Sequence, residues 1–284
     1  MEVERYADAA AFLERAGSFL GAREAEHNLL LGLCSRLARA PRLYGSDPYF
    51  ATVLDGGRVV GAALRTPPHR LVLSEIDSDG ACEALALDAA AVFGSLPGLL
   101  APAGRAAGFV SPWKRATGAR ARRSREQRIH RCERVLPPPP TPGQARPFRD
   151  DDRELASRWL DAFVEEAVGE SPVETGPAML ESRLSEPAGG LVLWDDGSPV
   201  SIAGFGGPTP NGIRVGPVYT PPEARRRGYA SALVAELTRS LLGGGRRFCF
   251  LFTDLANPTA NRIYRRLGYV PVTDVEEWSF DEPG

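Results

Sequence analysis

The sequence predicts an α/β fold with a mixed (α+β) sheet, divided between two domains. Short apolar runs typical of buried strands alternate with segments whose apolar residues recur at helical spacing. The chain has 284 residues, which favours two domains over one. A Pro-rich stretch at 136–144 marks the boundary, because polyproline is extended and semi-rigid. We predict an N-terminal domain over 1–135, a linker over 136–144 and a C-terminal domain over 145–284. A ligand for an aromatic-lined groove is the alternative role of this stretch.

The N-terminal domain is predicted to contain two helices, a hairpin, a strand, a helix and a further strand. The predicted ranges are 7–38 for the two helices, 49–54 and 59–64 for the hairpin, 71–74 for the strand, 82–93 for the helix and 96–100 for the last strand. Gly56 and Gly57 supply the hairpin turn. The segment Glu75–Gly80, which follows the strand at 71–74, is acidic and therefore unfavourable for a phosphate ligand.

The C-terminal domain repeats this order from an edge strand at 145–149. Asp150 or Asp151 is predicted to cap the next helix, which runs to Ala167. The remaining predicted ranges are 179–184 for a helix, 191–194 and 200–205 for a hairpin, 213–218 for a strand, 230–241 for a helix, 248–252 for a strand, 258–267 for a helix and 278–280 for a tail strand.

The turn between the strand at 213–218 and the helix at 230–241 carries the predicted chemistry. The first N–H groups of a helix have no internal partners and lie at the positive end of its dipole, so phosphate binds there. Gly228 lets a ligand approach the backbone closely. Arg225, Arg226 and Arg227 add fixed positive charge. These features together predict a pyrophosphate ligand.

Two motifs in this domain resemble those of the GNAT superfamily of acyl-CoA N-acyltransferases. Arg225-x-x-Gly228-x-Ala230 is similar to the family signature R/Q-x-x-G-x-G/A. The segment from Asn257 to Tyr269 resembles its second pattern, N-x-x-A-x-x-x-Y-x-x-x-G-[FY]. The resemblance covers roughly residues 145–280 and implies a GNAT N-acetyltransferase domain. The N-terminal domain resembles the family only in the order of its elements, which implies a degenerate GNAT-like domain that does not bind CoA in the usual way.

By this resemblance the co-substrate is acetyl-CoA. The strand before the basic turn would splay from its neighbour and pair with the pantetheine arm, the turn would bind the pyrophosphate, and two asparagines would lie near the pantetheine or adenosine phosphate. The residues implied in donor binding are Val218, Tyr219, Thr220, Arg225, Arg226, Arg227, Gly228, Tyr229, Ala230, Ser231, Asn257 and Asn261.

Direct attack of an amine on a thioester needs a base for the amine and an acid for the departing thiolate. Tyr264 matches the acid of the family, although a tyrosine on this apolar helix face would also serve for packing. Glu166 is the candidate base, with Glu165 and Glu170 as competitors and a solvated surface carboxylate as the alternative. Holding the two reactants together would reduce the need for a base.

The composition sets further limits on function. The net charge of −2 gives no reason to expect nucleic acid or an anionic membrane as partner. No signal peptide or membrane span is expected, so we predict a cytoplasmic protein. The cysteines and histidines lack metal-ligand spacing, so no metal is expected. The acceptor, a small-molecule or peptide amine, and the oligomeric state are not encoded by any motif. The alternatives to an acetyltransferase are a non-catalytic acyl-CoA-binding protein and a transferase with another acyl or aminoacyl donor.

Overall fold

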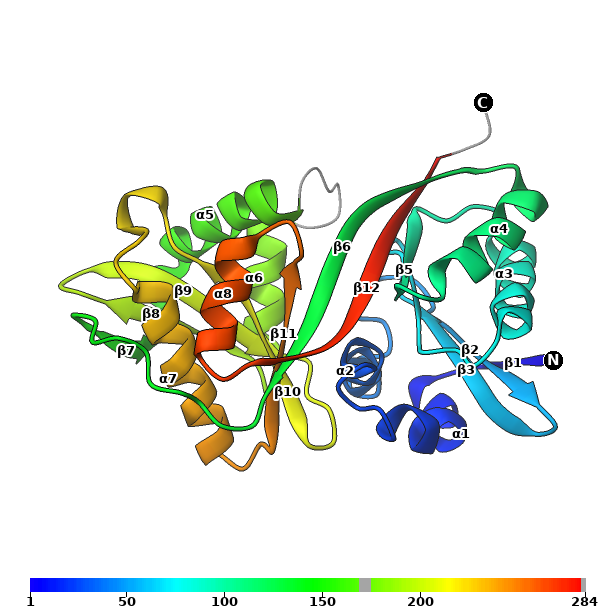
Figure 1. The fold of residues 1–284 in the computed structure, drawn as a ribbon, viewed down its shortest axis with the longest axis horizontal. Coiled ribbons are helices and arrows are strands. Elements are labelled where there is room, and N and C mark those ends of the chain that lie inside the picture. Colours follow the sequence, from blue (N-terminus) through cyan, green and yellow to red (C-terminus); the bar gives the residue numbers. More distant parts are fainter. Residues whose placement is uncertain (169–174, 282–284) are drawn as a thin grey trace. The chain divides into compact units, whose positions relative to one another are not determined.

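The computed structural model of the chain describes residues 1–168 and 175–281. The backbone divides into two compact units (Figure 1). Of the described residues, the first unit contains Met1–Ile129, Thr253–Ala256 and those from Val272 to Asp281, and the second contains those of His130–Phe252 together with Asn257–Pro271. Each unit combines helices with strands paired in both senses, so the predicted α/β fold with a mixed sheet is confirmed.

The first unit places its strands in the order β1-β2-β3-β4-β5-β12-β6. Its strands are β1 (Glu2–Tyr6), β2 (Tyr49–Asp55), β3 (Arg58–Arg65), β4 (Leu71–Leu73), β5 (Gly98–Pro102), β6 (Arg120–Cys132) and β12 (Val270–Asp281). Its helices are α1 (Ala9–Gly21), α2 (Asn28–Leu37), α3 (Asp79–Phe93) and α4 (Ala106–Thr117). The pair β4 and β5 is parallel, and β12 lies antiparallel to β5.

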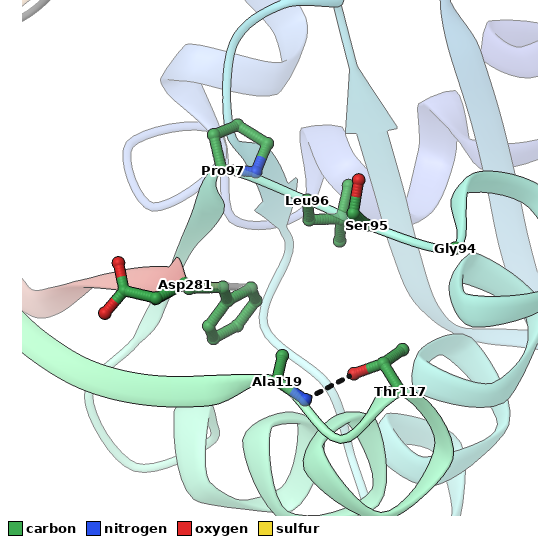
Figure 2. Close-up of a pocket in the computed structure, with 8 residues that line it drawn as sticks. Gly94, Ser95, Leu96, Pro97, Thr117, Ala119 and Asp281 are labelled. Atoms are coloured by element: carbon green, nitrogen blue, oxygen red, sulfur yellow. Dashed lines mark hydrogen bonds between the residues drawn. The ribbon is translucent and has the colours of Figure 1, made fainter. Parts of the chain in front are cut away.

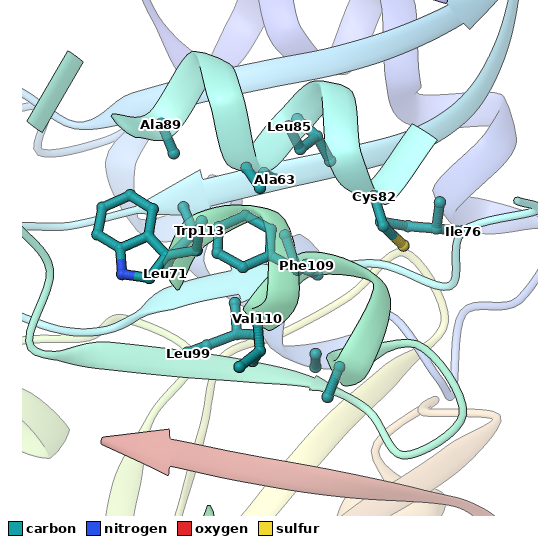
Figure 3. Close-up of a cluster of buried hydrophobic side chains, with 14 of the residues drawn as sticks. Ala63, Leu71, Ile76, Cys82, Leu85, Ala89, Leu99, Phe109, Val110 and Trp113 are labelled. Carbon is teal, nitrogen blue, oxygen red and sulfur yellow. The ribbon is translucent and has the colours of Figure 1, made fainter. Parts of the chain in front are cut away.

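Side chains of the first unit's sheet alternate between two cores, as the pleat of a strand requires. Phe50 and Leu64 pack with α1 and α2, whereas Ala63 on the opposite face packs with α3 and α4. Figure 3 shows this second core, in which Phe109 and Trp113 project from α4 beneath α3. Both aromatic residues are fully buried, and their rings stack at 6.0 Å between centroids.

The second unit places its strands in the order β11-β10-β9-β8-β7. Its strands are β7 (Gln144–Pro147), β8 (Gly190–Asp195), β9 (Pro199–Gly206), β10 (Gly212–Tyr219) and β11 (Phe248–Asp254). Its helices are α5 (Arg153–Phe163), α6 (Gly176–Leu184), α7 (Tyr229–Gly243) and α8 (Pro258–Arg266). Leu193 and Ile202 pack with α5 and α6, whereas Ile213 and Cys249 pack with α7 on the other face. The sheet therefore lies between two helical layers.

The described helices and strands confirm most of the predicted elements but differ in two respects. β1, α4 and β6 were not predicted: α4 contains Pro112, and β6 is an arginine-rich strand with an exposed first half, so neither shows a clear apolar period. The predicted cap of α5 was wrong. Asp150 and Asp151 lie in a 3₁₀ turn, and it is the Asp152 carboxylate that accepts the Arg149 N–H, at 2.8 Å.

The Pro-rich stretch at 136–144 belongs to the second unit and is hydrogen-bonded to other residues of that unit. Leu136 donates its N–H to the Leu267 carbonyl at 3.0 Å, and the Trp194 indole donates to the Pro142 carbonyl at 2.8 Å. The predicted tail strand is the end of β12, where Trp278 pairs with Leu99 of β5 in the first unit. The ranges 1–135 and 145–284 as separate domains stay a prediction.

Candidate functional site

β10 separates from its parallel neighbour β11 partway along its length. The register between them runs only from Gly212 opposite Phe248 to Arg214 opposite Phe250, although both strands continue. Beyond Arg214, β10 also shifts its register with β9, between Val215 and Val218. This irregularity is a β-bulge around Gly216, and the Gly216 carbonyl accepts the Arg183 Nε at 3.1 Å. The end of β10 therefore has backbone groups that are not paired with β11.

The basic turn and the start of α7 follow this splayed strand. Gly228 is the N-cap residue of α7, with φ +89°, and it has no side chain to cap the first N–H groups. Arg226 also has a positive φ, +65°. The Arg226 and Arg227 side chains are exposed, and neither has a carboxylate partner among the residues that the structure describes. The turn therefore presents uncapped N–H groups beside Arg226 and Arg227, two of the three arginines predicted there.

Arg225, the first arginine of the turn, contacts Thr220 and Glu166. The Arg225 Nε donates to the Thr220 carbonyl at 2.9 Å, and its Nη2 donates to both Glu166 carboxylate oxygens, at 2.9 and 2.7 Å. The guanidinium carbon lies 5.6 Å from the centre of the Tyr219 ring, and the Tyr219 hydroxyl donates to Glu166 Oε1 at 3.2 Å. Arg225, predicted to bind the donor, thus links the turn to the segment after α5.

Glu166, the candidate base, lies in a π-helical turn, Val164–Val168, that continues α5. Its Oε1 accepts hydrogen bonds from Arg225 and Tyr219, whereas its Oε2 accepts one from Arg225 alone, so Oε2 keeps a lone pair that could receive a proton. Glu165 is exposed and has no hydrogen bond or ion pair among the described residues. Glu170, the other competitor, lies outside the described residues. The structure therefore gives Glu166 partners that no local sequence pattern indicated.

Tyr264 lies on α8, whose local sequence behaves as predicted. The Asn257 side chain caps the helix by accepting the Ala260 N–H at 3.0 Å, and Pro258 is its first residue. The Tyr264 ring packs edge-on against Tyr269 at 5.9 Å, and burial raises the pKa of its phenol to about 12. Its hydroxyl has no hydrogen-bond partner within 1–168 and 175–281. The side chain thus packs, as the alternative interpretation held, yet keeps a protonated hydroxyl available.

Comparison with protein-family models decides what this half of the chain is. The model described as the acetyltransferase (GNAT) family matches residues 154–269. This region is a GNAT acetyltransferase domain. The match extends from α5 to the end of the second predicted motif at Tyr269, so it includes every described residue of the predicted donor and catalytic sites. The family typically uses acyl-CoA.

Solved structures extend the likeness from the GNAT domain to the whole chain. A tandem GNAT protein from the clavulanic acid biosynthesis pathway is 15% identical, with 100% of this chain and 99% of that one covered and a TM-score of 0.59. A GCN5-related N-acetyltransferase from Sphaerobacter thermophilus is 20% identical over 99% and 96%, with a TM-score of 0.61. A Drosophila protein is 14% identical over 99% of both chains, with a TM-score of 0.65. No curated protein matches. These identities show the fold alone, and the predicted tandem GNAT fold is confirmed.

The first unit has a different chemistry where the GNAT domain has its basic turn. Its strand β4, which is parallel to β5, is followed by the acidic segment 75–80, in which Ser78 caps α3. The Glu75 N–H donates to the buried His27 Nε2 at 3.0 Å, and the His27 Nδ1 lies 3.0 Å from the Leu20 carbonyl. A backbone N–H shortly after β4 is therefore already bound within the unit. Loss of CoA binding by this half remains a prediction.

A pocket of about 240 Å³ in the first unit contains none of the predicted site residues (Figure 2). It is lined by Gly94, Ser95, Leu96, Pro97, Thr117, Ala119, Phe280 and Asp281. The Thr117 hydroxyl there accepts the Ala119 N–H at 3.2 Å.

The described residues contain no helix long and apolar enough to cross a bilayer. Nor do they contain a cluster of three or more metal-ligating side chains.

Proposed function

We propose that this chain is an N-acetyltransferase that transfers the acetyl group of acetyl-CoA directly to an amine, in the cytoplasm. One observation carries the proposal: the uncapped start of α7, with its two exposed arginines, directly follows the splayed end of β10. That combination suits a long ligand with an amide-containing arm and a pyrophosphate. The family match of the same residues supports an acyl-CoA as this ligand.

The donor is bound, in this proposal, by backbone groups more than by side chains. Val218, Tyr219 and Thr220 would face the pantetheine arm, and the N–H groups of 226–231 would hold the pyrophosphate beside the Arg226 and Arg227 side chains. Asn257 and Asn261 would lie towards the pantetheine or the adenosine phosphate. Arg225 belongs to the same turn, but its guanidinium would act on Glu166 and not on the phosphates.

Two side chains would move the protons of the reaction. Acetyl-CoA, when bound, supplies the acetyl group as a thioester. As the amine nitrogen bonds to the acetyl carbon, the carbon–sulfur bond breaks, the nitrogen loses a proton and the sulfur gains one. Glu166 would receive the proton from nitrogen, on the Oε2 lone pair that Arg225 leaves free. Tyr264 would donate a proton to sulfur, since its raised pKa keeps the phenol protonated at neutral pH.

The test is a transfer assay on the full chain. Acetyl-CoA is incubated with a panel of small amines and amine-terminal peptides, and release of free CoA thiol and formation of the acetylated amine are followed together. The proposal predicts amine-dependent thiol release. Tight acetyl-CoA binding without release for any amine would favour the non-catalytic binding protein. Release with another acyl or aminoacyl donor in preference to acetyl-CoA would change the donor and leave the fold-level conclusion intact.

A further inference from the structure

Tyr229, the first residue of α7, is held by Asp196, a residue outside the basic turn and outside both sequence motifs. Tyr229 is 3% exposed, and its hydroxyl donates to the Asp196 Oδ2 at 2.5 Å. Asp196 lies in the turn between β8 and β9, thirty-three positions earlier in the sequence. A hydrogen bond to an ionised acceptor is stronger than one between neutral groups, so this contact fixes the start of the helix to the hairpin.

The hairpin that carries Asp196 is itself held in place. The Trp194 indole donates to the Pro142 carbonyl at 2.8 Å, and the Arg146 Nε of β7 donates to Asp195 at 2.9 Å. Arg146 is in turn paired with the buried Asp152 at 2.7 Å. These contacts fix Trp194 and Asp195, the two residues that directly precede Asp196.

The Pro-rich stretch lies on the turn as well. A Cβ built on Gly228 would stand 2.9 Å from the Thr141 hydroxyl oxygen, which places Thr141 directly against the glycine. The Thr141 hydroxyl donates to the Pro139 carbonyl at 3.1 Å, so it is fixed within its own segment. Thr141 therefore lies next to the basic turn, in addition to Asp196, which holds Tyr229.

We infer that Tyr229 and Asp196 are positioning residues that hold the first turn of α7 in the geometry needed to bind the donor's pyrophosphate. The inference rests on the proposed function. Its physical basis is that Gly228 offers no side-chain cap and Arg226 has a positive φ, so no capping side chain fixes the N–H groups at the start of α7. The phenol–carboxylate bond supplies the missing constraint from another element.

Tyr229→Phe removes the hydroxyl and keeps the ring. We expect the KM for acetyl-CoA to rise about tenfold, with kcat unchanged within about twofold. The rise should disappear with S-acetyl-pantetheine, a donor that has no pyrophosphate. Asp196→Asn keeps an oxygen acceptor and should raise the KM by only about threefold, whereas Asp196→Ala should match Tyr229→Phe.

Tyr49→Phe is the matched control. Tyr49 in the first unit is 7% exposed and donates its hydroxyl to Asp88 at 2.7 Å, so the same kind of bond is removed at a position outside the site. This variant should lose comparable thermal stability and keep the KM for acetyl-CoA. An equal rise in KM with acetyl-CoA and with S-acetyl-pantetheine would overturn the inference. So would a wild-type KM for acetyl-CoA in the folded Tyr229→Phe and Asp196→Ala variants.

A binding-independent measurement separates this inference from the proposed function. Hydrogen exchange of the α7 amides near Ala232 should be at least about tenfold faster in Tyr229→Phe than in the wild type and unchanged in Tyr49→Phe. If the wild type binds no acetyl-CoA, the proposed function fails. Unchanged exchange in Tyr229→Phe would overturn the positioning role whether or not the donor binds.

Discussion

Replacing Glu166 by Gln tests the proposed base against a purely structural role. Glu166 and Arg225 are joined by hydrogen bonds of 2.7 and 2.9 Å, but their side chains are 47% and 41% exposed. Exposed ion pairs of this kind contribute about 0.2–1 kcal/mol to the free energy of unfolding, because solvent screens them. The variant should therefore fold normally, with a loss of stability of at most about 1 kcal/mol.

The expected loss of activity is much larger. A general base contributes about 10²–10⁴-fold to the rate, so Glu166→Gln should lower kcat at least about 100-fold with any amine that the wild type accepts. Arg225→Gln is the matched variant: it breaks the same ion pair and leaves the carboxylate in place, so it should retain kcat within about tenfold. The assay is steady-state release of CoA thiol, combined with urea unfolding of all three proteins. A Glu166→Gln variant that keeps more than about a tenth of the wild-type kcat would refute the base role, and positioning of the amine would then supply the rate.

Three further outcomes follow from the described residues. Tyr264→Phe should lower kcat about 10²-fold, while the affinity for acetyl-CoA, measured by calorimetry, stays within about twofold. The pH–rate profile of the wild type should show no falling limb near 10.0, the ordinary pKa of a tyrosine, because burial raises the pKa of this phenol to about 12. Burial lowers the pKa of His27 below 6.5, so its neutral ring stabilises the fold fully above pH 6.5, and this stability is lost as the pH falls further. Urea unfolding should therefore give a lower free energy of unfolding at about pH 5 than at about pH 7.5, and His27→Gln should reduce the difference between the two values. Phe109→Ala empties a fully buried position in the core of Figure 3 and should cost about 3–5 kcal/mol by denaturant unfolding, and a loss below about 1 kcal/mol would contradict that core.

The sequence contained enough local information to predict most of the elements and both motifs. The cap at Asn257 and the glycine at the start of α7 are local signals, since each satisfies or exposes backbone groups within a few residues. β6 escaped prediction because an exposed, arginine-rich strand shows no apolar alternation, and its arginines pair with acidic residues far along the chain. Arg128, for example, binds Asp274 at 2.6 Å.

The partners of the site residues were beyond local patterns for the same reason. Arg225 fits the family signature in sequence, yet its guanidinium contacts Glu166, fifty-nine positions away. The bond between Tyr229 and Asp196 joins two turns that only the packing of β8 and β9 beneath α7 brings together. Contacts of this kind depend on the tertiary fold, so a sequence motif can predict the ligand class of a turn without predicting what holds the turn in place.

Calorimetric titration of acetyl-CoA into the full chain tests the central claim, that the basic turn of the GNAT domain binds a pyrophosphate donor. We predict saturable binding by the wild type. Reversal of both Arg226 and Arg227 to Glu should weaken it at least about tenfold, because favourable charges beside the helix terminus become repulsive. Reversal of Arg239, in the second half of α7, and Arg247, just before β11, to Glu changes the net charge equally and should leave the affinity within about twofold. No binding by the wild type, or equal weakening by both double variants, would contradict the claim.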